Sequence, residues 1–163
     1  MFIHDVIQLE VPFEQVRGRL LEGEGRWLAP LAANAYRDGE STVVSLGVAD
    51  EPVILSKNVT VVVDRPIDDG DVVAIPIRWQ ARDHASFFPF MDGHVEACPS
   101  GSTGTSLQLV GRYDPPGGRI GRLVDRVAMH RVAEAGARSF LRRVADGLVG
   151  ANTRVAPWPL PGP

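Results

Sequence analysis

Three histidine or cysteine side chains and three carboxylates lie close together in the second half of the chain: His84, His94 and Cys98, with Asp83, Asp92 and Glu96. Such side chains are the common protein ligands of divalent metals. On a strand, however, Asp92, His94 and Glu96 share one face. The other face is apolar: Met91, Gly93, Val95 and Ala97. Because an uncompensated buried charge is costly, we predict that the charged face meets solvent and that no metal is bound here.

A glycine- and hydroxyl-rich segment, residues 101–105, resembles two nucleotide or nucleophile motifs only superficially. A phosphate-binding loop needs a strand before it, a helix after it and a lysine. A serine nucleophile elbow needs the same strand-to-helix turn. Here a strand follows and the segment has no lysine, so we predict a hairpin turn. The single cysteine, Cys98, has no activating neighbour in the sequence and is predicted to be a small, partly buried thiol.

Large apolar and aromatic side chains are a better guide to function. In a cavity fold they line an apolar pocket, and a few polar groups orient the ligand. The predicted ligand-binding residues are Trp27, Tyr36, Trp79, Phe88, Phe90, Met91, Leu109 and Tyr113. Each of these also fits ordinary core packing, so the prediction depends on the set and on the fold. No catalytic residue is assigned.

Four polar side chains are considered as inward-pointing groups: Tyr36, Arg78, Arg112 and His130. Arg78 falls on the opposite strand face from Trp79 and is expected outside. His130 falls on the far side of the final helix from Ile120 and is also expected to be exposed.

The bulk composition describes an ordinary globular chain. Its 163 residues predict one domain, with 44% hydrophobic and 23% charged residues. The net charge of −3 argues against a nucleic-acid partner. One cysteine excludes an internal disulfide. We see no secretory signal and no apolar run of transmembrane length, and therefore expect a cytoplasmic protein without membrane insertion.

Periodicity and turn residues predict a strand, two short helices, a run of antiparallel strands and one long helix. Residues 2–11 alternate as a half-buried strand, and Pro12 opens a helix that ends near Gly23. A second short helix or turn covers 27–35. The following strands are predicted at 42–48, 53–64, 72–82, 87–98 and 103–113, with the pair Asp69-Gly70 as one of the turns.

The final helix is predicted over 119–149, from an apolar stripe at three- and four-residue intervals. The stripe consists of Ile120, Leu123, Val124, Val127, Ala128, Ala135, Leu141, Ala145 and Leu148. The helix also carries seven arginines: Arg119, Arg122, Arg126, Arg131, Arg138, Arg142 and Arg143. A solvated helix face explains them better than a nucleic-acid surface, because no aromatic residues are interleaved.

This element order resembles the START/Bet v 1-like superfamily, also called SRPBCC or polyketide cyclase-like. The resemblance covers residues 2–149 and depends on the strand from Gly104 to Leu109, the turn Pro115-Pro116-Gly117-Gly118 and the helix that follows. It implies an α+β helix-grip fold, in which a curved antiparallel sheet wraps around a long C-terminal helix and two short helices follow the first strand. We expect this domain over 1–150 and a proline-rich tail over 151–163.

The resemblance implies a binding protein for a small hydrophobic or amphipathic ligand, lipid- or polyketide-like, in a cavity between the sheet and the C-terminal helix, with no cofactor. One alternative is a cyclase or dehydratase-like enzyme, for which His94, Tyr36 or Arg112 would have to point inward. The other is a partner-binding protein that uses the arginine-rich helix. A homodimer remains open, because the apolar segment 59–63 could lie at a dimer edge or within the sheet.

Overall fold

The computed structural model describes residues 2–35, 59–81, 90–114 and 126–150. The first part contains β1 (Phe2–Leu9), α1 (Phe13–Leu21), the 3-10 turn η1 (Glu22–Gly25) and a helical segment at 28–35. The strands that follow are β2 (Val59–Val63), β3 (Ile67–Asp68), β4 (Val73–Ala81), β5 (Phe90–Ser100) and β6 (Gly104–Asp114). The long helix α3 is Arg126–Val149. This order confirms the α+β helix-grip prediction.

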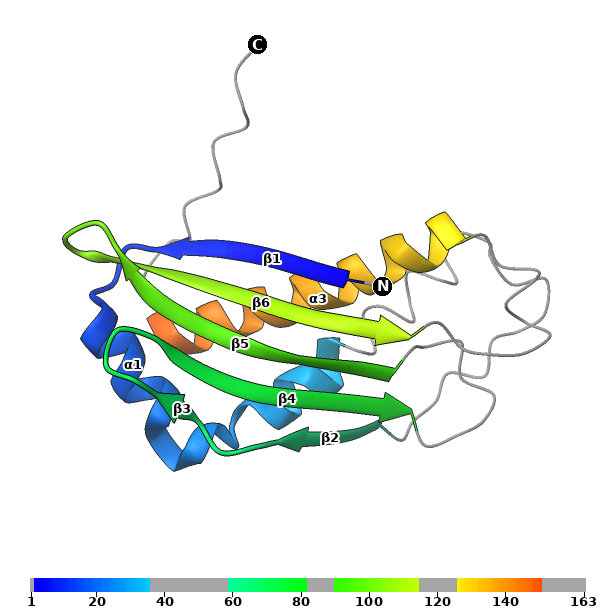
Figure 1. Ribbon diagram of the computed structural model, residues 1–163, viewed down its shortest axis with the longest axis horizontal. Coiled ribbons are helices and arrows are strands. Elements are labelled where there is room, and N and C mark those ends of the chain that lie inside the picture. Colours follow the sequence, from blue (N-terminus) through cyan, green and yellow to red (C-terminus); the bar gives the residue numbers. More distant parts are fainter. Residues whose placement is uncertain (1, 36–58, 82–89, 115–125, 151–163) are drawn as a thin grey trace, which may run out of the picture.

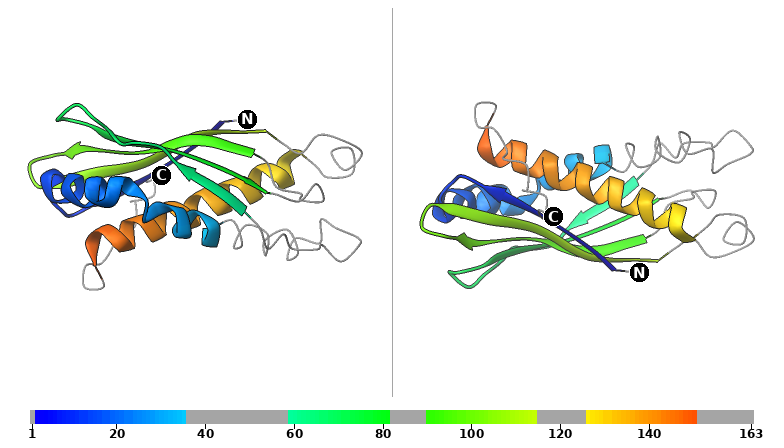
Figure 2. Two further views of the ribbon diagram at one scale, coloured as in Figure 1. Left: turned by 90° about the horizontal axis from the view of Figure 1, so that it is seen from below. Right: turned by 90° about the horizontal axis from the view of Figure 1, so that it is seen from above.

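The strands form one antiparallel sheet in the order β1-β6-β5-β4-β2, and β3 also pairs with β4. The first strand therefore pairs with the last one, β6 (Figure 1). Both α1 and α3 lie on the same face of the sheet, which we call the inner face (Figure 2). Figure 2 also shows that the sheet is curved rather than flat.

The core lies between the inner face and the helices. Strand alternation places Val73, Ile75 and Ile77 of β4 on this face, and all three are fully buried. From α1, Val16 and Leu20 are fully buried as well, as the helical spacing of its apolar residues requires. A Cβ atom at Gly25, which has a φ of +72°, would come within 2.9 Å of the Ile75 side chain, so a glycine is needed there.

Two glycines face each other in the middle of the sheet. Gly93 of β5 is the register partner of Gly111 of β6. A Cβ atom at Gly93 would collide with the backbone of Val110 and Gly111. The two strands therefore approach each other more closely here than side chains would permit.

A proline lies inside β4, where a strand normally needs its N–H group. Within a strand, the N–H and C=O of one residue point to the same side. The Pro76 carbonyl accepts a hydrogen bond from the Asp64 N–H, at 3.0 Å, on the side of β2 and β3. β2 pairs with β4 only from Ile77 onward and β3 only up to Ala74. The nitrogen of Pro76 thus points to the gap between β2 and β3, and the proline does not interrupt the hydrogen bonds between β4 and β5.

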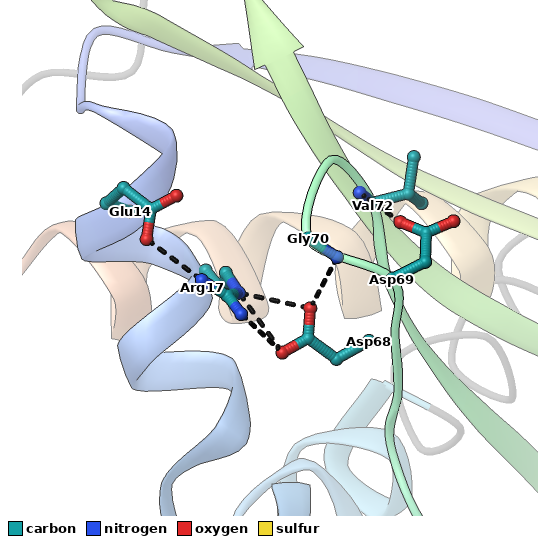
Figure 3. Close-up of polar contacts among 6 residues, drawn as sticks. All are labelled: Glu14, Arg17, Asp68, Asp69, Gly70 and Val72. Carbon is teal, nitrogen blue, oxygen red and sulfur yellow. Dashed lines mark hydrogen bonds and ion pairs between the residues drawn. The ribbon is translucent and has the colours of Figure 1, made fainter.

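A bidentate ion pair between Arg17 and Asp68, which we call the arginine fork, connects α1 to the β3–β4 hairpin (Figure 3). Arg17 donates to both carboxylate oxygens of Asp68, with distances of 2.8–3.1 Å, and to Glu14 at 3.1 Å. The hydrogen bond from Arg17, and next the one from the Gly70 N–H, lowers the pKa of Asp68 below its usual value. In the turn itself, the Val72 N–H donates to Asp69 at 2.8 Å. This network fixes the hairpin that the Asp69-Gly70 pair predicted.

Several predicted boundaries differ from the structure. The strand predicted at 87–98 and the connection predicted at 99–102 were wrong in part, because β5 continues to Ser100 and pairs through Pro99 and Ser100 with Thr105 and Gly104. The expected elements at 42–48 and 53–58, the helix start at 119–125 and the tail at 151–163 lie outside the described residues. Segment 59–63 is β2 and pairs with β4. Within the part of the chain that is described, no helix is both long and apolar enough to cross a membrane.

Candidate functional site

Three large side chains form a row across the inner face where β4 ends, β5 begins and β6 ends. Trp79 is the register partner of Met91, and Met91 is the partner of Tyr113. Their exposed fractions are 7%, 2% and 1%. All three belong to the predicted ligand-binding set, and strand alternation places them on the same face as the rest of the core. We call them the aromatic row.

Helix α3 covers the aromatic row. Phe140 of α3 is fully buried and meets Trp79 edge to face, with ring centroids 5.4 Å apart and an interplanar angle of 77°. This geometry is favourable for aromatic pairs. Among the side chains of α3 that the structure describes, the buried ones are Ala137, Phe140, Leu141, Val144, Ala145 and Leu148. The predicted stripe contained only Leu141, Ala145 and Leu148 of these and missed Phe140, although the regular spacing 137-140-141-144-145-148 was available in the sequence.

A buried phenol at the end of the row is hydrogen-bonded to a histidine of α3. The distance between Tyr113 Oη and His130 Nδ1 is 3.0 Å, and the two rings are nearly parallel at 23°. The other ring nitrogen, Nε2, lies 3.1 Å from a carboxylate oxygen of Glu134, one helical turn further on. Burial, and next the charge of Glu134, raises the pKa of Tyr113 above its usual value. We call these three residues the Tyr–His–Glu chain.

The expectation that His130 is exposed was therefore correct only in part. Its side chain is partly exposed, but its ring is also hydrogen-bonded to Tyr113 near the C-terminal end of β6. The prediction took Ile120 as the inward reference for the helix, and that residue lies outside the described part of α3. The i,i+4 spacing of His130 and Glu134 was a local signal for their contact. No local signal connects either residue to Tyr113, 17 positions earlier.

The Tyr–His–Glu chain spans from the interior to the surface. Tyr113 is almost completely buried, whereas the side chains of His130 and Glu134 are 39% and 48% exposed. A neutral imidazole has one donor and one acceptor nitrogen, and an imidazolium has two donors. The arrangement can therefore present a phenol to the interior whose hydrogen bonding responds to a group in contact with solvent.

The other predicted ligand-binding residues are distributed differently. Leu109 is fully buried on the inner face of β6. Trp27 is half-buried at another place, where a Cβ at Gly147 of α3 would lie 3.1 Å from its ring. Tyr36 and Phe88 lie outside the described residues; Phe90 starts β5, and its side chain lies outside them as well. The structure thus brings together Trp79, Met91 and Tyr113, places Leu109 on the same face in another row, in register with Val95, and separates Trp27 from them.

Trp27 borders an open depression of about 730 Å³. The other lining residues are Arg19, Glu22, Gly23, Glu24, Arg26 and Gly147. Within it, Arg26 pairs with Glu24 at 2.7 Å. The Trp27 Nε1 atom is buried and has no hydrogen-bond partner among the described residues. The charged residues that line this depression are two arginines and two glutamates.

The charged side chains of β4 and β5 lie on the outer face of the sheet, as the alternation predicted, whereas Asp5 of β1 lies on the inner face, in register with Leu109. His94 lies 3.5 Å from Glu96, and Arg78 pairs with Asp64 at 2.7 Å. Asp92 and Arg112 are exposed, and a shallow groove between them and Phe2 measures about 560 Å³. His94 and Arg112 therefore do not point inward, as the enzyme alternative required of them. Across the residues that the structure describes, no group of three or more metal-ligating side chains is assembled.

Four arginines of α3 have side chains that are described; three of them face outward, and Arg143 is half-buried with its Nε atom shielded from solvent. Arg131, Arg138 and Arg142 are exposed, and Arg138 lies 3.7 Å from Asp5 of β1. Cys98 is partly buried, as predicted. The partner-binding alternative stays a prediction.

No protein-family model matches the chain, and no curated protein matches it in sequence. Among solved structures, a conserved protein from Geobacillus kaustophilus is similar over 91% of this chain and 95% of its own, with a TM-score of 0.52 and 9% identity. An aromatase/cyclase from Streptomyces sp. R1128 has a TM-score of 0.44 and 14% identity, and covers 93% of this chain and 96% of its own. An HSP90 activator from Plasmodium falciparum has a TM-score of 0.41 and 14% identity over 91% and 96%.

At these identities the likeness concerns the fold alone. The sheet order, the inner-face helices and the long C-terminal helix are those of an α+β helix-grip fold. The resemblance in the sequence predicted this fold correctly.

Proposed function

We propose that the chain binds a small hydrophobic or amphipathic molecule, lipid- or polyketide-like, in a pocket between the inner face of the sheet and α3. The observation that supports this most is the aromatic row next to a buried polar group. Trp79 and Met91 offer an apolar wall, and Tyr113 offers one hydroxyl held by His130. Ligand pockets typically combine such a wall with a small number of placed polar groups.

The cost of the buried hydroxyl also supports the proposal. In a core that serves only stability, apolar side chains are favoured, because a buried polar group must be compensated by hydrogen bonds. Here Tyr113, at 1% exposure, has its partner on another element of the fold. A phenylalanine would fill nearly the same volume without needing a partner. The hydroxyl is therefore better explained by ligand recognition than by packing.

The first test is native mass spectrometry of gently purified protein, followed by solvent extraction of whatever is bound. We expect a stoichiometric apolar or amphipathic molecule and would identify its chemical class directly. A protein that stays ligand-free in this experiment, and in the titration below, would contradict the proposal.

The second test measures binding of the fluorescent probe 1-anilinonaphthalene-8-sulfonate to the full chain and to Trp79→Leu. Leucine keeps an apolar side chain against Phe140 but removes aromatic contact area, so we expect binding to weaken by about fivefold. Phe2→Leu is the matched control, because Phe2 is 59% exposed and borders the outer groove. Denaturant unfolding of each variant separates binding from folding. Equal losses in both variants would place the probe outside the proposed pocket.

A further inference from the structure

Strand β1 forms one edge of the sheet, and no described strand pairs with its other side (Figure 1). Its 8 residues pair with β6 without interruption, from Phe2 with Arg112 to Leu9 with Thr105, so the strand contains no bulge. It also contains no proline or lysine, and Phe2 at its start is 59% exposed. Long, regular edge strands of this kind tend to pair with another chain unless something prevents it.

The alternation of hydrogen bonds across the sheet identifies the backbone groups on the free side of β1. The backbone groups of Pro76 in β4 point away from β5, so those of its register partner His94 point toward Val110 of β6. The groups of Val110 therefore point toward β5, and those of its other partner, His4 of β1, point away from β6. By the same alternation, the N–H and C=O of Val6 also face the free side.

One of these free backbone groups is occupied by a side chain of the same strand. The Val6 N–H donates a hydrogen bond to Asp5 Oδ1 at 3.2 Å. The other carboxylate oxygen, Oδ2, lies 3.7 Å from Arg138 Nε of α3 and is buried without a hydrogen-bond partner among the described residues. A buried carboxylate oxygen without a hydrogen bond costs folding free energy. Packing alone therefore does not explain an aspartate at this position of the inner face.

We infer that Asp5 occupies the Val6 N–H and thereby prevents β1 from pairing with β1 of a second copy of the chain. In an antiparallel pair, only groups that face the free side can form hydrogen bonds. The two longest overlaps of β1 with itself then pair Val6 either with Val6 or with His4 of the second copy, and both need the Val6 N–H as a donor. Pairing would have to displace Asp5 from this donor and remove a hydrogen bond to a charged group. This inference is independent of the proposed function.

The test compares the full chain with Asp5→Ala by analytical ultracentrifugation, from low to high micromolar concentration. We expect the unmodified chain to stay monomeric. Asp5→Ala should dimerise with a dissociation constant at least about tenfold lower, the factor that corresponds to one hydrogen bond to a charged group. Asp5→Val repeats the test with a residue that favours strands and also has no acceptor atom. Circular dichroism and denaturant unfolding show whether each variant is folded.

Two further variants assign the effect to the Val6 N–H. Arg138→Gln removes the ion pair with α3 but keeps the hydrogen bond from Val6 to Asp5, so it should stay monomeric. Adding Val6→Pro to Asp5→Ala removes the donor on the free side without removing a hydrogen bond to β6, and proline is tolerated on edge strands. Dimerisation should then be lost. In the Asp5→Ala dimer, hydrogen exchange measured by mass spectrometry should be slower over residues 2–9 than in the monomer.

Four results would overturn the inference. The first is that the folded Asp5→Ala and Asp5→Val proteins associate no more tightly than the unmodified chain. The second is that Arg138→Gln dimerises as Asp5→Ala does, since the ion pair with α3 would then be responsible. The third is that dimers form without slower exchange at residues 2–9, which would place the contact on another surface. The fourth is that neither Asp5 variant folds, because Asp5 would then serve folding. None of these results bears on ligand binding, which is tested separately.

Discussion

Two rows of the same inner face, six residues apart along β4, are built from different side chains. At the α1 end, Val73 pairs with Ala97 and Ala97 with Leu107, and all three are fully buried aliphatic residues. At the other end, roughly 20 Å away by strand geometry, the aromatic row carries a phenol hydrogen-bonded to α3. One sheet thus combines a row suited to stability with a row that keeps a buried polar group.

The difference separates packing from recognition. The aliphatic row contains no side-chain polar atom and lies at the end of the sheet that packs against α1. Arg17 of α1 also pairs with Asp68 of the adjacent hairpin (Figure 3). The aromatic row contains a group that must be compensated by a hydrogen bond from another element. Proteins that keep such groups usually do so where function requires them. The contrast is therefore the main physical reason why we propose a ligand site at the aromatic row.

The largest expected effect is on the aliphatic row. Leu107→Ala should lower the free energy of unfolding by about 3 kcal/mol, because it removes buried methyl groups and leaves a cavity. Denaturant unfolding measures this change, and Val62→Ala is the control because Val62 is 41% exposed. Probe binding by the folded Leu107→Ala protein should be almost unchanged. A large loss of binding affinity in that variant would contradict the separation of the two rows.

An intermediate effect is expected at alkaline pH from the aromatic row. The pKa of Tyr113 is raised in the folded state, so its contribution to stability is present below the pKa of an unfolded tyrosine, about 10, and is lost as the pH rises above it. The unmodified chain should therefore lose more stability between pH 9 and 11 than Tyr113→Phe does. Thermal unfolding at several pH values measures the difference. Identical alkaline profiles would show that the folded phenol ionises as easily as the unfolded one.

The smallest expected effect is at acidic pH, from the fork at the aliphatic end. The pKa of Asp68 is lowered by Arg17, so the contribution is present above the pKa of an unfolded aspartate and is lost as the pH falls through the lower folded value. Between pH 6 and pH 2, Arg17→Gln should lose less stability than the unmodified chain. Arg26→Gln, which removes the exposed pair with Glu24, provides the control. If the melting temperatures of both variants fall by the same amount between pH 6 and pH 2, the arginine fork contributes no more to stability than the exposed Arg26–Glu24 pair.

Much of the fold could be predicted from local patterns. Alternation in β4 identified both its inner face and its exposed Arg78, and the alternation of β5 placed His94 and Glu96 outside. The end of β5 was not predictable in this way. Pro99 suggested a connection, but its pairing with Thr105 extends the strand to Ser100. The buried Thr105 hydroxyl also donates a hydrogen bond to the Val11 carbonyl at 2.7 Å, which stabilises this end of the sheet.

The candidate site could be predicted only in part. Trp79, Met91, Leu109 and Tyr113 were recognised as one set, because residue type and strand parity are local properties. The apolar spacing of the helix could have identified Phe140 as buried, but not its contact with Trp79 or the contact of His130 with Tyr113, because periodicity does not give how a helix is rotated and shifted on the sheet. That setting results from contacts between residues far apart in the sequence, such as Trp79 with Phe140.

For the described residues, the sequence by itself therefore determined most of the elements, the inward parity of β4, β5 and β6 and the class of fold, since these follow from side-chain periods of 2 and 3.6 residues. Only the tertiary structure decided that Trp79, Met91 and Tyr113 are register partners and that His130 meets Tyr113. The physical reason is that strand register and helix placement are set by the packing of the whole core. A short pattern contains no information about which distant partner will fill the space beside it.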